Sequence, residues 1–237
     1  MFTDIHHHLI WGVDDGANSP EETFRMVDES VADGVSAIVT TPHITPGEEP
    51  FPAEVYEDHF SQTEAYIREK GYNLKLYRGN EILYTDHTAR MLREGRILPL
   101  GGTRYVLTEF VPDDSYDRLI RAGEKIRQAG FVPIFAHTER YMCLKRTRQV
   151  RELKEEIGVL IQVNARSLLH KQPLLRRHFF KGLFEENLVD FIASDTHSFA
   201  GRQTCMSRAY EVLRSEQGEE YAERVFKHNQ EYILKQT

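Results

Sequence analysis

The chain alternates between short apolar runs and longer segments in which apolar residues recur every three or four positions. The short runs are rich in β-branched and aromatic residues and mostly lack strict alternation with polar residues, as is typical of strands buried on both faces. They predict seven strands, at residues 3–8, 37–42, 74–79, 105–110, 132–137, 159–164 and 190–194.

The longer segments predict helices, and the first of them carries the clearest signals. Ser19 as N-cap, Pro20 in the first turn and Glu22 three residues after the cap together predict a capping box. Gly34 is typical of a helix end. Further amphipathic patterns predict helices at residues 53–70, 85–94, 115–128, 147–156, 173–186, 203–216 and 219–236.

Strands that alternate with helices indicate parallel βαβ units. Seven such units within 237 residues fit a closed or nearly closed barrel better than an open sheet, and we expect residues 1–237 to form a single domain. The predicted fold class is therefore α/β. In such a barrel the carboxyl ends of all strands lie at one rim, which is where active sites are built.

Composition narrows the function classes. Apolar residues make up 40% of the chain and charged residues 28%, a balance typical of soluble globular proteins. No apolar run approaches the ~20 residues that span a bilayer, and the first residues lack the basic region of a secretion signal, so we expect a cytoplasmic protein without membrane insertion. The net charge of −7 argues against nucleic acid as a partner.

The two cysteines, Cys143 and Cys205, exclude a disulfide framework and a zinc knuckle. Cysteine-dependent phosphatases place an arginine six positions after the nucleophile. Here Gln149 follows Cys143 at that interval and Glu211 follows Cys205. Catalysis by a cysteine of that type is therefore not expected.

Six of the seven predicted strands carry a histidine or a carboxylate at or just beyond the carboxyl end, and the seventh carries an asparagine. These candidate ligands are His6, His8, His43, Glu81, Glu109, His137, Asn164, Asp195 and His197. So much acidic and imidazole character at one partly buried rim is unfavourable unless cations neutralise it. Mixed nitrogen and oxygen ligands without thiolates favour Mn, Fe or Zn, and nine ligands are enough for two or three ions.

Other polar residues are interpreted by position. The alternation of a strand turns His7 away from His6 and His8, which favours packing or a supporting contact. The remaining histidines lie in helical or loop context and are interpreted as surface or packing residues. Arg140 and Arg202 closely follow ligand positions, where guanidinium groups could bind phosphate oxygens. The basic run after Arg140, residues 145–154, is more typical of a solvated helix face than of a substrate-binding patch.

Seven motifs together carry a family resemblance: DIHHH, GVDDGA, TTPH, GNEI, TEF, HTERY and ASDTH. With them the chain resembles the polymerase-and-histidinol-phosphatase (PHP) family of metal-dependent phosphoesterases, and within it the bacterial protein-tyrosine phosphatases of capsule and exopolysaccharide loci. The similarity extends over essentially the whole chain.

The resemblance implies a distorted (β/α)7 barrel with three metal ions, of which Mn is the most expected and Fe or Zn are alternatives. It implies a ligand set that is carried over residue by residue: His6, His8, Asp15, His43, Glu81, Glu109, His137, Asp195 and His197. Glu81 is expected to bridge ions, and Asp15 is favoured over Asp14 as the ligand. Arg140 and Arg202 match the phosphate-binding arginines of the family.

The implied function is hydrolysis of phosphotyrosine by a metal-bound hydroxide, with the C-terminal tail of a bacterial tyrosine kinase as substrate. Two alternatives stay open at this point. The first is a small-molecule phosphomonoesterase such as a histidinol-phosphate phosphatase, which would use the same metal ligands. The second is a metal-binding regulatory domain without catalysis, although such domains typically lose ligands and this set is complete.

Overall fold

Within residues 1–48 and 50–236, which the computed structural model describes, nine short strands form two parallel sheets. The first sheet has the order β1-β2-β4, with β1 at Phe2–His7, β2 at Val35–Thr40 and β4 at Lys75–Arg78. The second has the order β3-β5-β6-β7-β8-β9. Its strands are β3 (His43–Ile44), β5 (Glu81–Leu83), β6 (Tyr105–Glu109), β7 (Val132–Phe135), β8 (Leu160–Asn164) and β9 (Phe191–Ala193).

All seven predicted strands are confirmed, but β3 and β5 were not predicted. β3 follows β2 after Thr41 and Pro42, and β5 follows β4 after Gly79 and Asn80. Pro42 has no N–H to donate to a ladder. The pairing of β2 with β4 stops before Pro42, and the pairing of β3 with β5 begins after it. The backbone N–H of Glu81 donates to the Pro42 carbonyl at 3.1 Å across this break. Two strand positions of the fold are therefore each divided in two.

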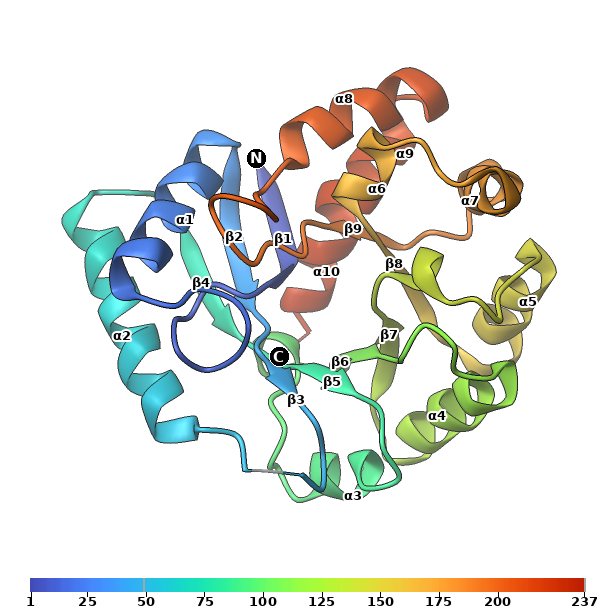
Figure 1. Ribbon diagram of the computed structural model, residues 1–237, viewed down its shortest axis with the longest axis horizontal. Helices are drawn as coiled ribbons and strands as arrows, with labels where there is room; N and C mark the ends of the chain where they lie inside the picture. Colours follow the sequence, from blue (N-terminus) through green and yellow to red (C-terminus); the bar gives the residue numbers. More distant parts are fainter. Residues whose placement is uncertain (49, 237) are drawn as a thin grey trace.

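The first and last strands lie side by side (Figure 1). His7 and Thr196 form a parallel bridge, the Asp195 N–H donates to the His6 carbonyl, and the His8 N–H donates to the Thr196 carbonyl, both at 2.9 Å. These bonds join the start of the strand order to its end, as in the expected distorted barrel. The hydrogen-bonded ladders themselves remain two separate sheets.

Helices surround the strands (Figure 1). They are α1 (Pro20–Ala32), α2 (Ala53–Glu69), α3 (Thr88–Arg93), α4 (Tyr116–Gln128), α5 (Thr147–Glu152), α6 (Ala165–Leu169), α7 (Leu174–Glu185), α8 (Met206–Gln217), α9 (Glu219–Glu223) and α10 (Asn229–Leu234). The predicted helix at 147–156 continues from α5 into a π-turn at Leu153–Ile157, and a second π-turn at Arg224–His228 joins α9 to α10. The five-residue α6 was not predicted. Among the described residues, no helix is both long enough and apolar enough to cross a bilayer.

The start of α1 departs in one detail from the predicted capping box. The Ser19 hydroxyl accepts the Glu22 N–H at 3.3 Å, as expected. The Glu22 carboxylate, however, accepts the N–H of Asn18 at 2.9 Å, one residue before the cap. The helix ends as predicted, with Asp33 as C-cap and Gly34 at a φ of 86°.

Apolar side chains from the strands fill the interior of the ring. Ile5, Val39, Leu107 and Ile134 are fully buried there, and Ile233 of α10 packs against the same cluster. α10 packs against β1, and the side chain of Gln230 in α10 donates to the Ile192 carbonyl of β9 at 3.1 Å, so the helix covers one end of this interior. A second, larger cluster lies between the strands and the surrounding helices.

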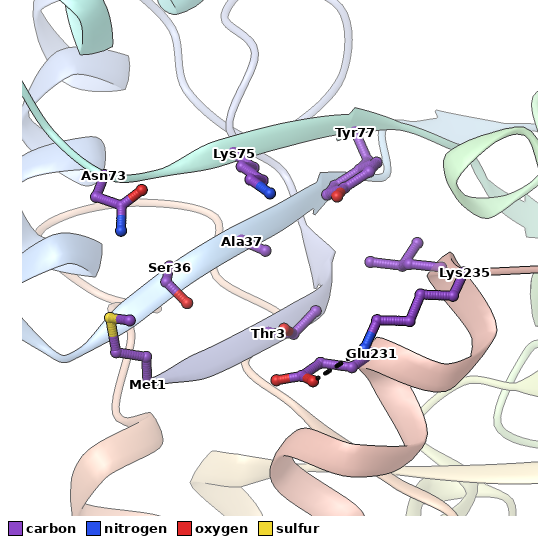
Figure 2. Close-up of a pocket in the computed structure, with 10 residues that line it drawn as sticks. Met1, Thr3, Ser36, Ala37, Asn73, Lys75, Tyr77, Glu231 and Lys235 are labelled. Atoms are coloured by element: carbon purple, nitrogen blue, oxygen red, sulfur yellow. Dashed lines mark ion pairs between the residues drawn. The ribbon is translucent and has the colours of Figure 1, made fainter.

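A cavity of about 320 Å³ lies beside α10, against the amino-terminal half of the first sheet (Figure 2). Thr3, Ala37 and Tyr77 line it from the strands, and Glu231 lines it from α10. Glu231 forms an ion pair with Lys235 at 3.6 Å on its rim. β4 is the most exposed strand, and it lies at the edge of the first sheet.

The packing of α10 predicts a difference between two neighbouring substitutions. Ile233→Ala should lower the free energy of unfolding by about 2–5 kcal/mol, because Ile233 is 2% exposed and its loss leaves a void in the ring interior. Tyr232→Ala is the matched control, since Tyr232 is 59% exposed, and it should change the free energy by no more than about 0.5 kcal/mol. Urea unfolding measures both, and equal losses would show that α10 does not close the core.

Candidate metal centre and phosphate site

The structure brings the nine predicted ligands together at the carboxyl ends of the strands. β1 supplies His6, with His8 just beyond it, and β3 and β5 begin with His43 and Glu81. Glu109 ends β6, and the loops after β7 and β9 carry the rest except one. Asp15 comes from the loop between β1 and α1. Segments up to 191 positions apart in the sequence, from His6 to His197, thus meet at one rim.

The buried carboxylate of Glu81 lies at the centre of this group, with 1% exposure. Its Oε2 is 3.0 Å from His6 Nε2, 3.2 Å from His8 Nε2 and 3.2 Å from His43 Nδ1. Its Oε1 is 3.0 Å from His137 Nε2. The ladder explains part of this arrangement, because β3 and β5 pair with His43 directly beside Glu81. One carboxylate therefore contacts four imidazoles.

Three overlapping sets of side chains have the geometry of cation sites. In each set one ligand atom per residue lies within 4.8 Å of the others. The sets are His8, Asp15, His43 and His197; His6, His8, Glu81 and Asp195; and His43, Glu81 and Glu109. His8, His43 and Glu81 each belong to two sets. His137 belongs to none of them, but its Nε2 is 3.0 Å from Glu81 and 3.4 Å from Glu109.

Several buried atoms of this cluster make no well-oriented hydrogen bond among the described residues, although imidazole nitrogens or carboxylate oxygens lie within ion-pair distance of them. They include Glu81 Oε2, Asp195 Oδ1 and His197 Nε2. Unpartnered polar atoms are rare in protein interiors because each costs about 1–3 kcal/mol. These three atoms lie near one another in the centre of the rim, and they are of the types that ligate divalent cations. The residues present therefore fit a metal cluster.

Three histidines have their Nδ1 atoms next to a hydrogen-bond acceptor. His8 Nδ1 is 2.6 Å from Asp14 Oδ2, His6 Nδ1 is 3.3 Å from Gln162 Oε1, and His197 Nδ1 is 3.1 Å from the backbone oxygen of Asp195. A proton on Nδ1 leaves the lone pair of Nε2 directed at the centre of the cluster, which is the arrangement that metal-ligating histidines use.

The adjacent aspartates differ in their surroundings. Besides His8, the buried Asp14 carboxylate accepts the N–H groups of Gly16 and His43, so it fixes the loop. Asp15 has a side chain that is 66% exposed, and its Oδ1 is 3.3 Å from His43 Nε2. Asp15 therefore has a carboxylate available for a cation, whereas Asp14 is already occupied.

Two residues of the cluster have left-handed backbone conformations. His137 has φ 31° and ψ 49°, and Asp195 has φ 56°. Such conformations cost a non-glycine residue about 1–3 kcal/mol and concentrate at functional sites. Backbone hydrogen bonds hold both: the His137 N–H donates to Gln162 Oε1 at 2.8 Å, and the Asp195 N–H donates to His6. Nothing in the sequence pattern signals this strain.

The cluster favours charged carboxylates despite its burial. Burial by itself would raise the pKa values of Glu81 and Asp195, but the positive charge of His6 and the other cations hold the pKa of each well below its usual range. Both groups therefore stay ionised at neutral pH.

The histidines respond in opposite directions. Burial lowers the pKa of His8, but hydrogen bonds with Asp14 and Glu81 outweigh it and raise the pKa to about 10. For His197, burial and repulsion by His8 lower the pKa to about 2. In the chain without ions, protons on some imidazoles thus compensate the carboxylates, and a cation would have to displace them.

Arg140 and Arg202 converge on one edge of the cluster. Their Nη2 atoms lie 2.9 and 2.6 Å from Asp195 Oδ2, and Asn164 Nδ2 donates to the same oxygen at 2.6 Å. The two arginine side chains are 44% and 39% exposed, so each keeps donors that face solvent. The basic run beyond Arg140 is mostly neutralised, in the pairs Arg148–Glu152, Arg151–Glu186 and Lys154–Asp190, which supports its interpretation as a solvated face.

Gln162 is a supporting residue that the sequence interpretation missed. It is fully buried in β8, contacts His6 and His137 through Oε1, and donates from Nε2 to Asn164 Oδ1 at 2.8 Å. The signal was two polar residues two positions apart in an apolar strand, a spacing that places both on one face. His7 packs away from the cluster as expected, with its Nε2 3.3 Å from Ser30 in α1.

The comparisons with known proteins give the fold and the class. A chain from the crystal structures of YwqE from Bacillus subtilis and CpsB from Streptococcus pneumoniae, metal-dependent tyrosine phosphatases, superposes with a TM-score of 0.87. The match has 26% identity and covers 99% of this chain and 95% of that one. The fold of this chain is thus that of the metal-dependent tyrosine phosphatases.

The sequence comparisons identify the family. The family described as capsular polysaccharide synthesis, CpsB/CapC, matches residues 2–235, and the chain belongs to it. The tyrosine-protein phosphatase CpsB of Streptococcus agalactiae is 32% identical over 98% of both chains. CpsB of Streptococcus pneumoniae is 31% identical over 98% of this chain and 97% of its own. The family resemblance and the enzyme class expected from the motifs are confirmed.

The role of Gln162 can be tested without any assay of function. Gln162→Leu should lower the free energy of unfolding by about 2–5 kcal/mol, because it leaves the His137 N–H and the Asn164 side-chain oxygen buried without partners. Gln62→Leu, at an exposed position of α2, is the control and should change it by no more than about 0.5 kcal/mol. Chemical denaturation in the presence of chelator measures both, and a loss no larger than that of the control would contradict the network.

Proposed function

We propose that this chain is a metal-dependent protein-tyrosine phosphatase whose metal ligands are His6, His8, Asp15, His43, Glu81, Glu109, His137, Asp195 and His197. The observation that carries the proposal is the overlap of three cation-site geometries through shared side chains. Shared carboxylates and neighbouring sites are what clusters of two or three ions need. Membership of a family with metal-dependent tyrosine phosphatases supports the same conclusion.

The ligand chemistry favours hard to intermediate divalent ions. Every ligand is an imidazole or a carboxylate, and both cysteines lie outside the three ligand sets. Mn is the ion we expect, with Fe or Zn as alternatives. Ions bound here would supply Lewis acidity and would lower the pKa of a coordinated water from 15.7 to about 7.

The residues of the chain have distinct roles in this proposal. Arg140 and Arg202 bind the phosphate oxygens, because their guanidinium groups converge beside the cluster and keep donors exposed. Asp195 holds the two arginines beside the cluster through its ion pairs with both, and Asn164 in turn donates to Asp195. Asp14 keeps the Nδ1 proton on His8 so that Nε2 stays available.

The leaving group needs little help from a general acid in the site. A tyrosine phenolate has a conjugate-acid pKa of about 10 and departs more readily than an alkoxide, so a strong general acid is not required. The thiols are poor nucleophiles, because burial raises the pKa of Cys205 to about 11 and that of Cys143 above its usual value. Hydrolysis then proceeds without a phosphocysteine intermediate.

The substrate we infer is a phosphotyrosine-containing protein, the C-terminal tail of a bacterial tyrosine kinase of capsule or exopolysaccharide synthesis. The family description supports the connection with capsule synthesis. We further propose that residues 1–237 act as one cytoplasmic phosphatase domain.

Metal removal tests the proposal directly. Elemental analysis of protein never exposed to chelator should give two or three divalent ions per chain. Chelation should reduce turnover of a phosphotyrosine peptide by at least about 100-fold, and Mn should restore it, because the ions supply the activated water.

Thiol chemistry provides the control for that experiment. Cys143→Ser and Cys205→Ser should both keep turnover within about twofold of the wild type, because neither thiol belongs to the cluster. One ion or fewer per chain, or activity that survives chelation, would overturn the proposal.

Arg140→Ala and Arg202→Ala should leave the metal content unchanged and lower kcat/KM for the phosphotyrosine peptide by about 30- to 1,000-fold. Arginine has no lone pair for a metal, and the loss is that of one charge-assisted phosphate contact, felt partly in kcat. Lysine at either position should restore only part of the rate because it lacks the planar fork.

Arg104→Ala is the matched control, because Arg104 is exposed and immediately precedes β6 at the other end of the strands. It should retain kcat/KM within about twofold. If both Arg140→Ala and Arg202→Ala turn over substrate like this control, the two arginines have no part in phosphate binding.

A further inference from the structure

A cavity of about 240 Å³ opens directly beside the proposed phosphate site. Arg140, Asp195 and Arg202 form one wall of it. The opposite wall comes from α6 and the segment after it, and its residues include Arg166, Ser167, His170, Lys171 and Gln172. A substrate whose phosphate contacts the two arginines would therefore have this cavity next to that phosphate.

The cavity is strongly cationic. Its lining includes the side chains of Arg140, Arg166, Lys171 and Arg202, against the single carboxylate of Asp195. That carboxylate is already shared by Arg140 and Arg202. The other two cations are thus not compensated from within the cavity.

The cavity continues along α7. A second cavity of about 520 Å³ shares His170, Lys171 and Gln172 with the first. It adds the cations of Arg177 and Lys181 and the carboxylates of Glu185 and Glu216, so cations outnumber carboxylates in both cavities. Its apolar lining consists of Leu168, Phe180 and Phe184. α6 and α7 lie together on one side of the molecule (Figure 1). We define the basic groove as these two cavities from Arg166 to Lys181.

The cations nearest the phosphate site in this groove are available to a ligand. Within residues 1–48 and 50–236, Arg166, Lys171 and Arg177 have no carboxylate at ion-pair distance, whereas Lys181 at the far end pairs with Glu185 at 2.7 Å. Lys171 and Arg177 are exposed. Arg166 donates to the backbone oxygen of Gln203 at 3.2 Å, which ties α6 to the loop that carries Arg202.

Other loops at the same rim have the opposite charge. Asp86 follows β5 and Asp113 follows β6, and both are exposed, whereas Asp114 is paired with Arg118 at 3.1 Å. An acidic segment next to the phosphate would be repelled from those loops and attracted to the groove. The rim thus carries negative charge on these loops and positive charge in the groove. Repulsion by the loops contributes to specificity as attraction by the groove does.

We propose that the basic groove binds acidic side chains that flank the phosphotyrosine of the substrate. This inference rests on the proposed function and specifies its substrate class: phosphotyrosine segments rich in aspartate or glutamate. The groove acts by electrostatic attraction beside the phosphate site and contributes mainly to KM, since its cations do not meet charge that develops during the reaction.

Two phosphotyrosine peptides of equal length test the proposal, one with aspartate and glutamate on both sides of the phosphotyrosine and one with serine and glycine. At about 50 mM ionic strength the wild type should show at least tenfold higher kcat/KM for the acidic peptide, and about 0.5 M salt should remove most of that preference. The variant Lys171→Glu/Arg177→Glu should lower kcat/KM for the acidic peptide about tenfold, through KM. It should leave the serine–glycine peptide and p-nitrophenyl phosphate within about twofold.

Lys75→Glu is the control for a change of charge, because Lys75 is exposed in β4 at the other end of the strands. It should not alter the preference. Equal kcat/KM for both peptides in the wild type, or an equal loss in the Lys75→Glu variant, would overturn the proposal.

Binding measurements separate this proposal from the proposed function. If no phosphate ester is hydrolysed, the phosphatase assignment fails, and fluorescence anisotropy of the labelled peptides still decides on the groove. Tighter binding of the acidic phosphopeptide that the double variant weakens about tenfold would support it. Equal binding by wild type and double variant would overturn it, as would equal affinity for the same acidic peptide without phosphate, because the groove adjoins a phosphate site.

Discussion

The contact of one buried carboxylate, Glu81, with four imidazoles is the interaction on which the rim depends. A carboxylate removed from water is costly unless opposite charge lies close by. Imidazoles at the ends of several strands supply this opposite charge. His137 and Asp195 take part in the cluster from left-handed backbone conformations. Protons on His8 and His137, whose pKa values are raised to about 10 and about 9, compensate the charge when no ion is bound. The same geometry that makes so many carboxylates and imidazoles unfavourable without compensating charge makes the cluster receptive to divalent cations.

Much of this could be predicted from the sequence, because strands and their polar ends leave a local signal. A histidine two positions from another in a strand points the same way, and parallel strands bring their carboxyl ends to one rim. β3 and β5 escaped prediction because two and three residues are too few to show a period. Gln162 and the strain at His137 escaped it for a different reason. Their roles exist only in contacts such as that of Gln162 with His6, 156 positions apart.

The two ends of the ring of strands differ in the side chains that they carry. At one end α10 covers the apolar interior with Ile233, and the neighbouring cavity is lined by both polar and apolar side chains. At the other end polar groups are concentrated, and cations extend from Arg140 along α6 and α7. Changes that alter substrate preference can therefore accumulate on α6 and α7 with little effect on the core. Conversely, the covering helix can vary in its exposed residues without reaching the phosphate site.

The hydrogen bonds between β1 and the loop after β9 have a consequence for the order of folding. His6 and His8 are synthesised before their neighbours Asp195 and His197, which follow them by 189 positions. Contacts across such a separation close late, since loop entropy opposes them. During synthesis His6 and His8 therefore remain without these partners until residues 195–197 have been added. The proposed ligand set becomes complete only with the loop after β9, so a nascent chain cannot present all of these side chains to a cation before then.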